Sequence, residues 1–101
     1  MSFVKVAKAS EIPVGGAKVV LVQDRPIAIF KVKEGEFYAI TNTCPHQGGP
    51  LGEGYLDGYS VTCPWHAWEF DIRTGACGTV PQDRIKSYKL KLEGDDLLIS
   101  L

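Results

Sequence analysis

The segments Cys44-Pro45-His46 and Cys63-Pro64-Trp65-His66 decide how this sequence folds and what it binds. Each segment offers one thiol and one imidazole, in a C-x-H spacing that is followed, after 16 residues, by a C-x-x-H spacing. The chain has only two histidines and three cysteines, and this pattern takes both histidines and two of the cysteines. Thiolates and imidazoles are common metal ligands, so the pattern predicts a metal centre.

The mixture of ligand types within each segment indicates a [2Fe–2S] cluster of the Rieske kind, in which two histidines replace two cysteines on one iron. Such a cluster needs four donors, and the sequence supplies Cys44, His46, Cys63 and His66. Exchanging two thiolates for neutral imidazoles removes negative charge around the metals, which raises the reduction potential above that of an all-thiolate cluster. Glycines crowd the stretch between the two segments and would let the backbone approach the metals closely.

Three alternative sites could use the same residue types. A structural zinc site also accepts two thiolates and two imidazoles, but zinc fingers usually pair Cys with Cys and His with His. A disulfide between Cys44 and Cys63 would leave both histidines without a role. A Cys–His nucleophile pair would not need to be present twice.

The stretches CPHQGGPLGEG and CPWHAWEFDIRTG resemble the Rieske family, and most closely its small soluble ferredoxins. The resemblance extends along nearly the whole chain, and its specific part runs from about residue 41 to residue 81. It implies that Cys44 and Cys63 hold the inner iron and that His46 and His66 hold the outer one. It also implies that a third loop, which contains Pro81, covers the cluster.

Departures from the family pattern indicate a low-potential member. High-potential members carry two further cysteines that form a disulfide between the loops, and the matching positions here are Gly49 and Trp65. Hydroxyl groups that donate to cluster sulfur in those members are replaced by Trp68 and Phe70. Hydrogen bonds to sulfur favour the reduced cluster and raise its reduction potential. Because these hydroxyl groups are missing here, we expect a potential at the low end of the Rieske range, on the order of −150 mV.

Length and composition fit one soluble domain over residues 1–101, with a cluster-binding lobe at about residues 41–81. The net charge of −1 gives no basic surplus for nucleic acid or for a membrane surface. No apolar run reaches the roughly 18 residues of a membrane span, and the stretch MSFVKVAKASEIP lacks the apolar core that a signal peptide would have. Three cysteines favour a reducing compartment, so we expect a cytoplasmic protein. The spare Cys77 is expected to be buried and inert.

The periodicity predicts an all-β fold, an antiparallel β-sandwich or barrel of the Rieske type into which the cluster-binding lobe is inserted. A short helical turn is expected at residues 9–13, with Ser10 as its cap. The expected strands cover residues 3–6, 18–22, 26–33, 37–40, 55–62 (as a hairpin), 67–71, 85–92 and 97–101.

The function expected from the resemblance is one-electron transfer, with no independent catalytic chemistry. A flavin-dependent reductase would supply the electron, and a terminal oxygenase, of an aromatic-ring-hydroxylating dioxygenase, would accept it. Alternatives are the small subunit of an NAD(P)H-dependent nitrite reductase, which would pair with the large subunit, and the ferredoxin of a multicomponent monooxygenase. We expect a monomer that docks transiently, because electron-transfer encounters are small and weak. Candidates for the docking rim are Gln47, Pro50, Leu51, Trp65 and Pro81.

Overall fold

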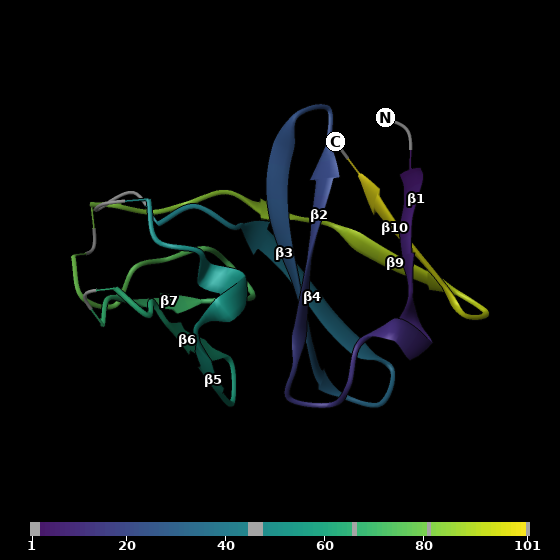
Figure 1. The fold of residues 1–101 in the computed structure, drawn as a ribbon, viewed down its shortest axis with the longest axis horizontal. Coiled ribbons are helices and arrows are strands. Elements are labelled where there is room, and N and C mark those ends of the chain that lie inside the picture. The colour runs from purple at the N-terminus through teal and green to yellow at the C-terminus, as the bar shows by residue number, and fades with distance from the viewer. Residues whose placement is uncertain (1–2, 45–47, 66, 81, 101) are drawn as a thin grey trace.

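The computed structural model describes residues 3–44, 48–65, 67–80 and 82–100, and these residues form three antiparallel sheets (Figure 1). The strands are β1 (Phe3–Lys8), β2 (Ala17–Val22), β3 (Arg25–Lys33), β4 (Glu36–Thr41), β5 (Tyr55–Asp57), β6 (Ser60–Thr62), β7 (Glu69–Asp71), β8 (Ser87–Tyr88), β9 (Leu90–Glu93) and β10 (Asp96–Ser100). Two 3₁₀ turns, η1 (Ala9–Glu11) and η2 (Leu51–Glu53), join some of them. None of the helices in the described part of the chain approaches the length needed to cross a lipid bilayer.

The four-stranded sheet, with strand order β2-β3-β4-β8, lies at the centre of the fold. Alternate residues of β3 enter different hydrophobic cores, because successive side chains of a strand point to opposite faces. Ile27 and Ile29 pack with Leu97 of the β1-β10-β9 sheet on one face. Phe30 packs on the other face with residues of the segment between β4 and β8. The all-β antiparallel fold predicted from the sequence is therefore confirmed.

The segment between β4 and β8 contains η2 and the small β5-β6-β7 sheet, and it projects to one side of the central sheet (Figure 1). Leu56, Val61 and Phe70 alternate with polar residues along the three short strands. Val61 and Phe70 are fully buried, and Leu56 packs against the same core. Burial of a side chain as large as Phe70 stabilises a fold by about 1.5–3 kcal/mol. This core holds the projecting segment on the sheet.

Two local predictions were wrong. The expected strand over residues 85–92 is divided, because β8 pairs with β4 while β9 pairs with β10 in a different sheet. Ser10 does not cap the first turn. The Glu11 carboxylate accepts a hydrogen bond from the Lys8 N–H instead, at 2.9 Å, and the Ser10 hydroxyl donates to Asp95 at 2.8 Å.

Candidate metal centre

The first cysteine loop leaves the end of β4 and returns at η2, and Asn42 closes its base. The Asn42 carbonyl accepts a hydrogen bond from the Leu51 N–H at 2.7 Å. Its side-chain oxygen accepts a second one from the Gly52 N–H, also at 2.7 Å. Gly52 must lack a side chain, because a Cβ there would lie 2.5 Å from a methyl group of Val19. The loop is therefore tied to the central sheet on both sides of Cys44.

Within this loop, Cys44 makes two backbone hydrogen bonds that fix its position. Its N–H donates to the Gly49 carbonyl at 2.9 Å, and its carbonyl accepts from the Gly48 N–H at 2.8 Å. Gly48 has φ of 77°, a left-handed conformation that glycine adopts without steric cost. The Cys44 side chain is buried, with 2% exposure.

The second cysteine loop, between β6 and β7, repeats this arrangement around Cys63. The Cys63 N–H donates to the Trp68 carbonyl at 2.7 Å, and the Cys63 carbonyl accepts from the Ala67 N–H at 3.1 Å. Ala67 has φ of 59°, which is unusual for a residue with a side chain. Cys63 is 3% exposed and belongs to the same hydrophobic core as Cys44. The two predicted thiol ligands are thus brought together at equivalent turns.

The two loops also touch each other. A Cβ added to Gly49 would lie 2.6 Å from the Cys63 Sγ and 3.2 Å from the Cγ of Trp65. The backbone of the first loop therefore packs directly against the thiol of the second. No disulfide joins Cys44 to Cys63. Two buried thiols presented by paired, closely packed turns fit the sulfur half of the predicted donor set.

The other half of the donor set, His46 and His66, lies outside the described residues, as do Gln47 and Pro81 of the expected rim. The two cysteine loops and the segment after β7 converge at the far end of the projecting part (Figure 1). We call this end, formed around Cys44 and Cys63, the tip.

The spare Cys77 is buried at 3% exposure, as predicted, and it lies in the same core as the two loop cysteines. Its sulfur accepts a hydrogen bond from the Val80 N–H at 3.2 Å. Its backbone forms an isolated β-bridge with Phe70. This thiol therefore fixes the turn over residues 77–80, a contact that no pattern in the sequence indicates.

The expected docking rim is only partly supported by the described residues. Trp65 is 55% exposed, as a rim residue should be, and Pro50 is half-buried. Leu51 was predicted wrongly, because it is fully buried in the core beneath η2. Trp65 also lies beside Gly49, so the two positions at which the resemblance to high-potential Rieske proteins implies the extra cysteines are neighbours in the fold.

A charged and aromatic cluster joins the projecting segment to β4. The Tyr38 hydroxyl donates to the Glu36 carboxylate at 2.6 Å, and this hydrogen bond to a carboxylate raises the pKa of Tyr38 to about 12. A hydrogen bond to the same carboxylate raises the pKa of Tyr59. Arg73 lies over the Tyr59 ring, 4.3 Å from its centroid, and its hydrogen bonds lower the pKa of Asp71.

Comparison with known proteins supports the family that the two cysteine–histidine segments predict. Residues 2–89 match the family of the Rieske [2Fe-2S] domain. The ferredoxin component of a naphthalene 1,2-dioxygenase system from Pseudomonas aeruginosa is 40% identical over 93 residues, which cover 90% of this chain and 88% of that protein.

Solved structures share the fold. A chain in the complex of reduced oxygenase and oxidized ferredoxin of carbazole 1,9a-dioxygenase is 29% identical, with a TM-score of 0.86 and coverage of 97% of this chain and 92% of that one. A putative nitrite reductase NADPH small subunit has a TM-score of 0.89 over the full length of both chains, but at 16% identity it shows the fold alone. Together with the match over residues 2–89, these findings place the chain in the Rieske family, whose cofactor is a [2Fe–2S] cluster.

Proposed function

We propose that this chain is a ferredoxin that carries single electrons from a flavin-dependent reductase to the terminal oxygenase of an aromatic-ring-hydroxylating dioxygenase. The observation that carries the proposal is the 40% identity to a dioxygenase ferredoxin over nearly the whole of both chains. The solved carbazole dioxygenase complex adds a structural relative from an oxygenase–ferredoxin assembly. A nitrite reductase small subunit shares the fold at only 16% identity, which favours the dioxygenase assignment.

We assign Cys44, His46, Cys63 and His66 as the protein ligands of the cluster. The burial of Cys44 and Cys63 supports this assignment, since both thiols lie in one core and neither forms a disulfide. When bound, a [2Fe–2S] cluster with two thiolate and two imidazole ligands takes up and releases one electron at a time. The chain itself keeps the thiols away from water and presents the tip to a partner.

Exposure of Trp65 supports docking at the tip. Aromatic residues are enriched at protein interfaces, and this one lies next to the proposed ligand His66 in the sequence. We propose that a partner docks transiently on a single copy of the chain. None of the three cysteines forms a disulfide, which supports a reducing compartment such as the cytoplasm.

Ligand variants test the cofactor assignment. Cys63→Ala or His66→Ala should abolish the rhombic EPR signal of the reduced protein and most of its iron and acid-labile sulfide. The matched control is Cys77→Ser, which should retain both because Cys77 lies outside the proposed ligand set. Retention of a full cluster by the Cys63 variant would refute the assignment.

Reconstituted turnover tests the partner assignment. The purified protein, with a flavin reductase and a naphthalene dioxygenase terminal oxygenase, should support NADH-dependent formation of the dihydroxylated product. In parallel, it should fail to support nitrite reduction by a nitrite reductase large subunit. The opposite pattern would exclude the proposed role and favour a nitrite reductase subunit.

A further inference from the structure

The outward face of the small β5-β6-β7 sheet is the feature that the proposed function does not use. The strand register places Tyr55 opposite Thr62 and Thr62 opposite Glu69, which makes one cross-strand row. The next row whose side chains share this face, beyond the inward-facing row of Leu56, Val61 and Phe70, has Ser60 between Asp57 and Asp71. We call this surface, formed by Tyr55, Asp57, Ser60, Thr62, Glu69 and Asp71, the acidic sheet face.

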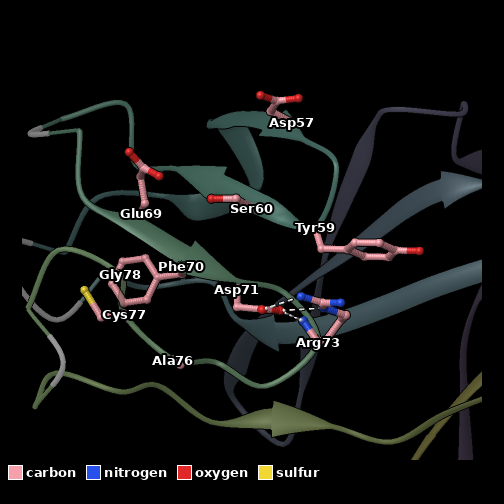
Figure 2. A pocket seen from close by; sticks show the side chains of 10 residues that line it. All are labelled: Asp57, Tyr59, Ser60, Glu69, Phe70, Asp71, Arg73, Ala76, Cys77 and Gly78. Atoms are coloured by element: carbon pink, nitrogen blue, oxygen red, sulfur yellow. Dashed lines mark hydrogen bonds and ion pairs between the residues drawn. The ribbon is translucent and has the colours of Figure 1, made fainter.

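Side chains on this face point away from the hydrophobic core. Figure 2 shows Asp57, Ser60 and Glu69 on one side of the sheet, and Phe70 and Cys77 on the other. An open groove of about 450 Å³ lies along the edge of β7 in the projecting segment, and it is lined by residues from Gly78 to Arg73. The face is thus accessible, and it extends from the proposed docking site.

Carboxylates on the acidic sheet face outnumber the cations that could neutralise them. Arg73 is committed to Asp71 through two hydrogen bonds, of 3.1 and 2.8 Å, and stacks on the Tyr59 ring. Within the described part of the chain, Asp57 and Glu69 have no ion-pair partner. Both are exposed, so their charges act on whatever approaches the face.

The charge is also divided unevenly along the chain. Residues 41–81 contain four Asp or Glu and one Arg, which gives a net charge of −3. The remaining residues contain 10 Lys or Arg and eight Asp or Glu, which gives a net charge of +2. A small protein with this asymmetry approaches a positive surface with its acidic end forward, which raises the rate of productive encounters.

We propose that the acidic sheet face is a docking surface for a basic patch, rich in Lys and Arg, on a redox partner of this protein. Lysine and arginine side chains would lie against Asp57 and Glu69, while their alkyl stems cover the exposed ring of Tyr55. Such a contact, beside the tip, orients the partner without a large buried area, as transient electron-transfer encounters require. The inference rests on the proposed electron-carrier function.

The test uses the cluster-loaded protein, chemically reduced, and two electron acceptors of opposite charge. A basic c-type cytochrome represents a partner with a lysine-rich surface, and ferricyanide represents an anion. Stopped-flow oxidation rates are compared for the parent, the Asp57→Asn/Glu69→Gln variant and the Asp24→Asn/Glu93→Gln variant. The second variant is the matched control, since it removes two exposed carboxylates outside residues 41–81 and changes the net charge equally.

We expect Asp57→Asn/Glu69→Gln to slow oxidation by the cytochrome about three- to tenfold at low salt, and the control to leave it nearly unchanged. The difference in oxidation rate between the parent and Asp57→Asn/Glu69→Gln should disappear as the salt concentration rises from about 0.01 M to about 1 M, because the Debye length falls from about 30 Å to about 3 Å. Oxidation by ferricyanide should not slow, because removing carboxylates weakens the repulsion of an anion.

Equal rates for the two double variants with the cytochrome would overturn the docking surface. So would an equal slowing with both acceptors, which would indicate a changed cluster rather than a lost contact. Because the reductant is chemical, failure here leaves the proposed function intact. Failure of that function would instead appear as a missing EPR signal or as no turnover with the oxygenase.

Discussion

The two cysteine loops share one backbone arrangement but differ in the side chains that fill it. In each loop, the cysteine N–H donates to the carbonyl five residues later, and its carbonyl accepts from the N–H four residues later. The first loop places Gly48 and Gly49 at these two positions, whereas the second places Ala67 and Trp68 there. The hydrogen bonds therefore set the conformation of the turn, and the side chains determine how each loop packs against its surroundings.

The packing around the two loops differs at the position five residues after each cysteine. At Gly49 there is no room for a side chain, because the Cys63 Sγ and the Trp65 ring occupy the space. Trp68, at the matching position, packs against the hydrophobic core instead. The first loop therefore brings its backbone close to the second loop, and the second loop contributes a large side chain to the core. The two loops have the same backbone hydrogen bonds but different packing.

Gly49→Ala should break this arrangement most severely. The new Cβ would lie 2.6 Å from the Cys63 Sγ, so the proposed ligand or the loop must move. We expect loss of most of the cluster and a loss of about 1–3 kcal/mol in the free energy of unfolding, as for other overpacked sites. Iron and acid-labile sulfide per chain, with thermal unfolding, measure both effects.

Gly48→Ala is the control for that experiment. Among the described residues, its Cβ would meet only a Thr43 methyl group, at 3.8 Å, so the expected cost is that of the left-handed φ of 77°, about 1–2 kcal/mol. The cluster should still assemble. If both alanine variants lost the cluster equally, close packing against Cys63 would not be the reason that Gly49 is required.

Cys77 tests whether the third segment of the tip depends on a sulfur acceptor. Cys77→Ala leaves the Val80 N–H without its acceptor and removes a buried atom, which should cost about 1–2 kcal/mol in the free energy of unfolding. The reduced protein should also lose its cluster faster in air, as seen from the bleaching of its visible absorbance. Cys77→Ser, which keeps an acceptor, should bleach more slowly than Cys77→Ala; the reverse order would contradict the positioning role.

The sequence predicted the loops better than their packing. One C-x-H and one C-x-x-H segment, which together use both histidines and two of the three cysteines, were enough to predict the cluster. The burial of Cys44 and Cys63 is consistent with that prediction. Leu51 was misassigned to the surface because a leucine between a proline and a glycine has no periodicity that indicates its direction. Its burial depends on η2 folding back on the central sheet, a contact between segments far apart in the sequence.

The fold shows the same limit at the C-terminal end. Alternation over residues 85–92 correctly predicted extended chain, but it could not show that Lys89 separates two strands that belong to different sheets. Period-2 patterning records which face of a strand is buried, not which strand it pairs with. Pairing depends on the packing of the whole sheet, which no local pattern encodes.

Ala67→Gly should make the second loop resemble the first, with a small effect. The left-handed φ of 59° strains alanine, and glycine relieves that strain at the expense of a more flexible unfolded chain. We expect the free energy of unfolding to rise by up to about 1 kcal/mol, measured by chemical denaturation. Ala67→Val should lower it, because a β-branched residue fits this conformation poorly. A Val variant more stable than the parent would contradict the left-handed φ at residue 67.

The projecting segment is also held at two different places, through Asn42 at the base of the first cysteine loop and through Tyr59, whose hydrogen bond to Glu36 joins the β5–β6 turn to β4 beside Tyr38. Glu36→Gln keeps an acceptor but removes the charge, so the pKa of Tyr38 should fall from about 12 toward its ordinary 10.0. A folded-state pKa above the unfolded value gives stability that is complete below about pH 10 and lost as the pH rises through about 12. The variant should therefore lose less stability than the parent over this range. Tyrosinate absorbance and alkaline unfolding measure both effects, and an unchanged titration of Tyr38 would show that its pKa is not set by the charge of Glu36.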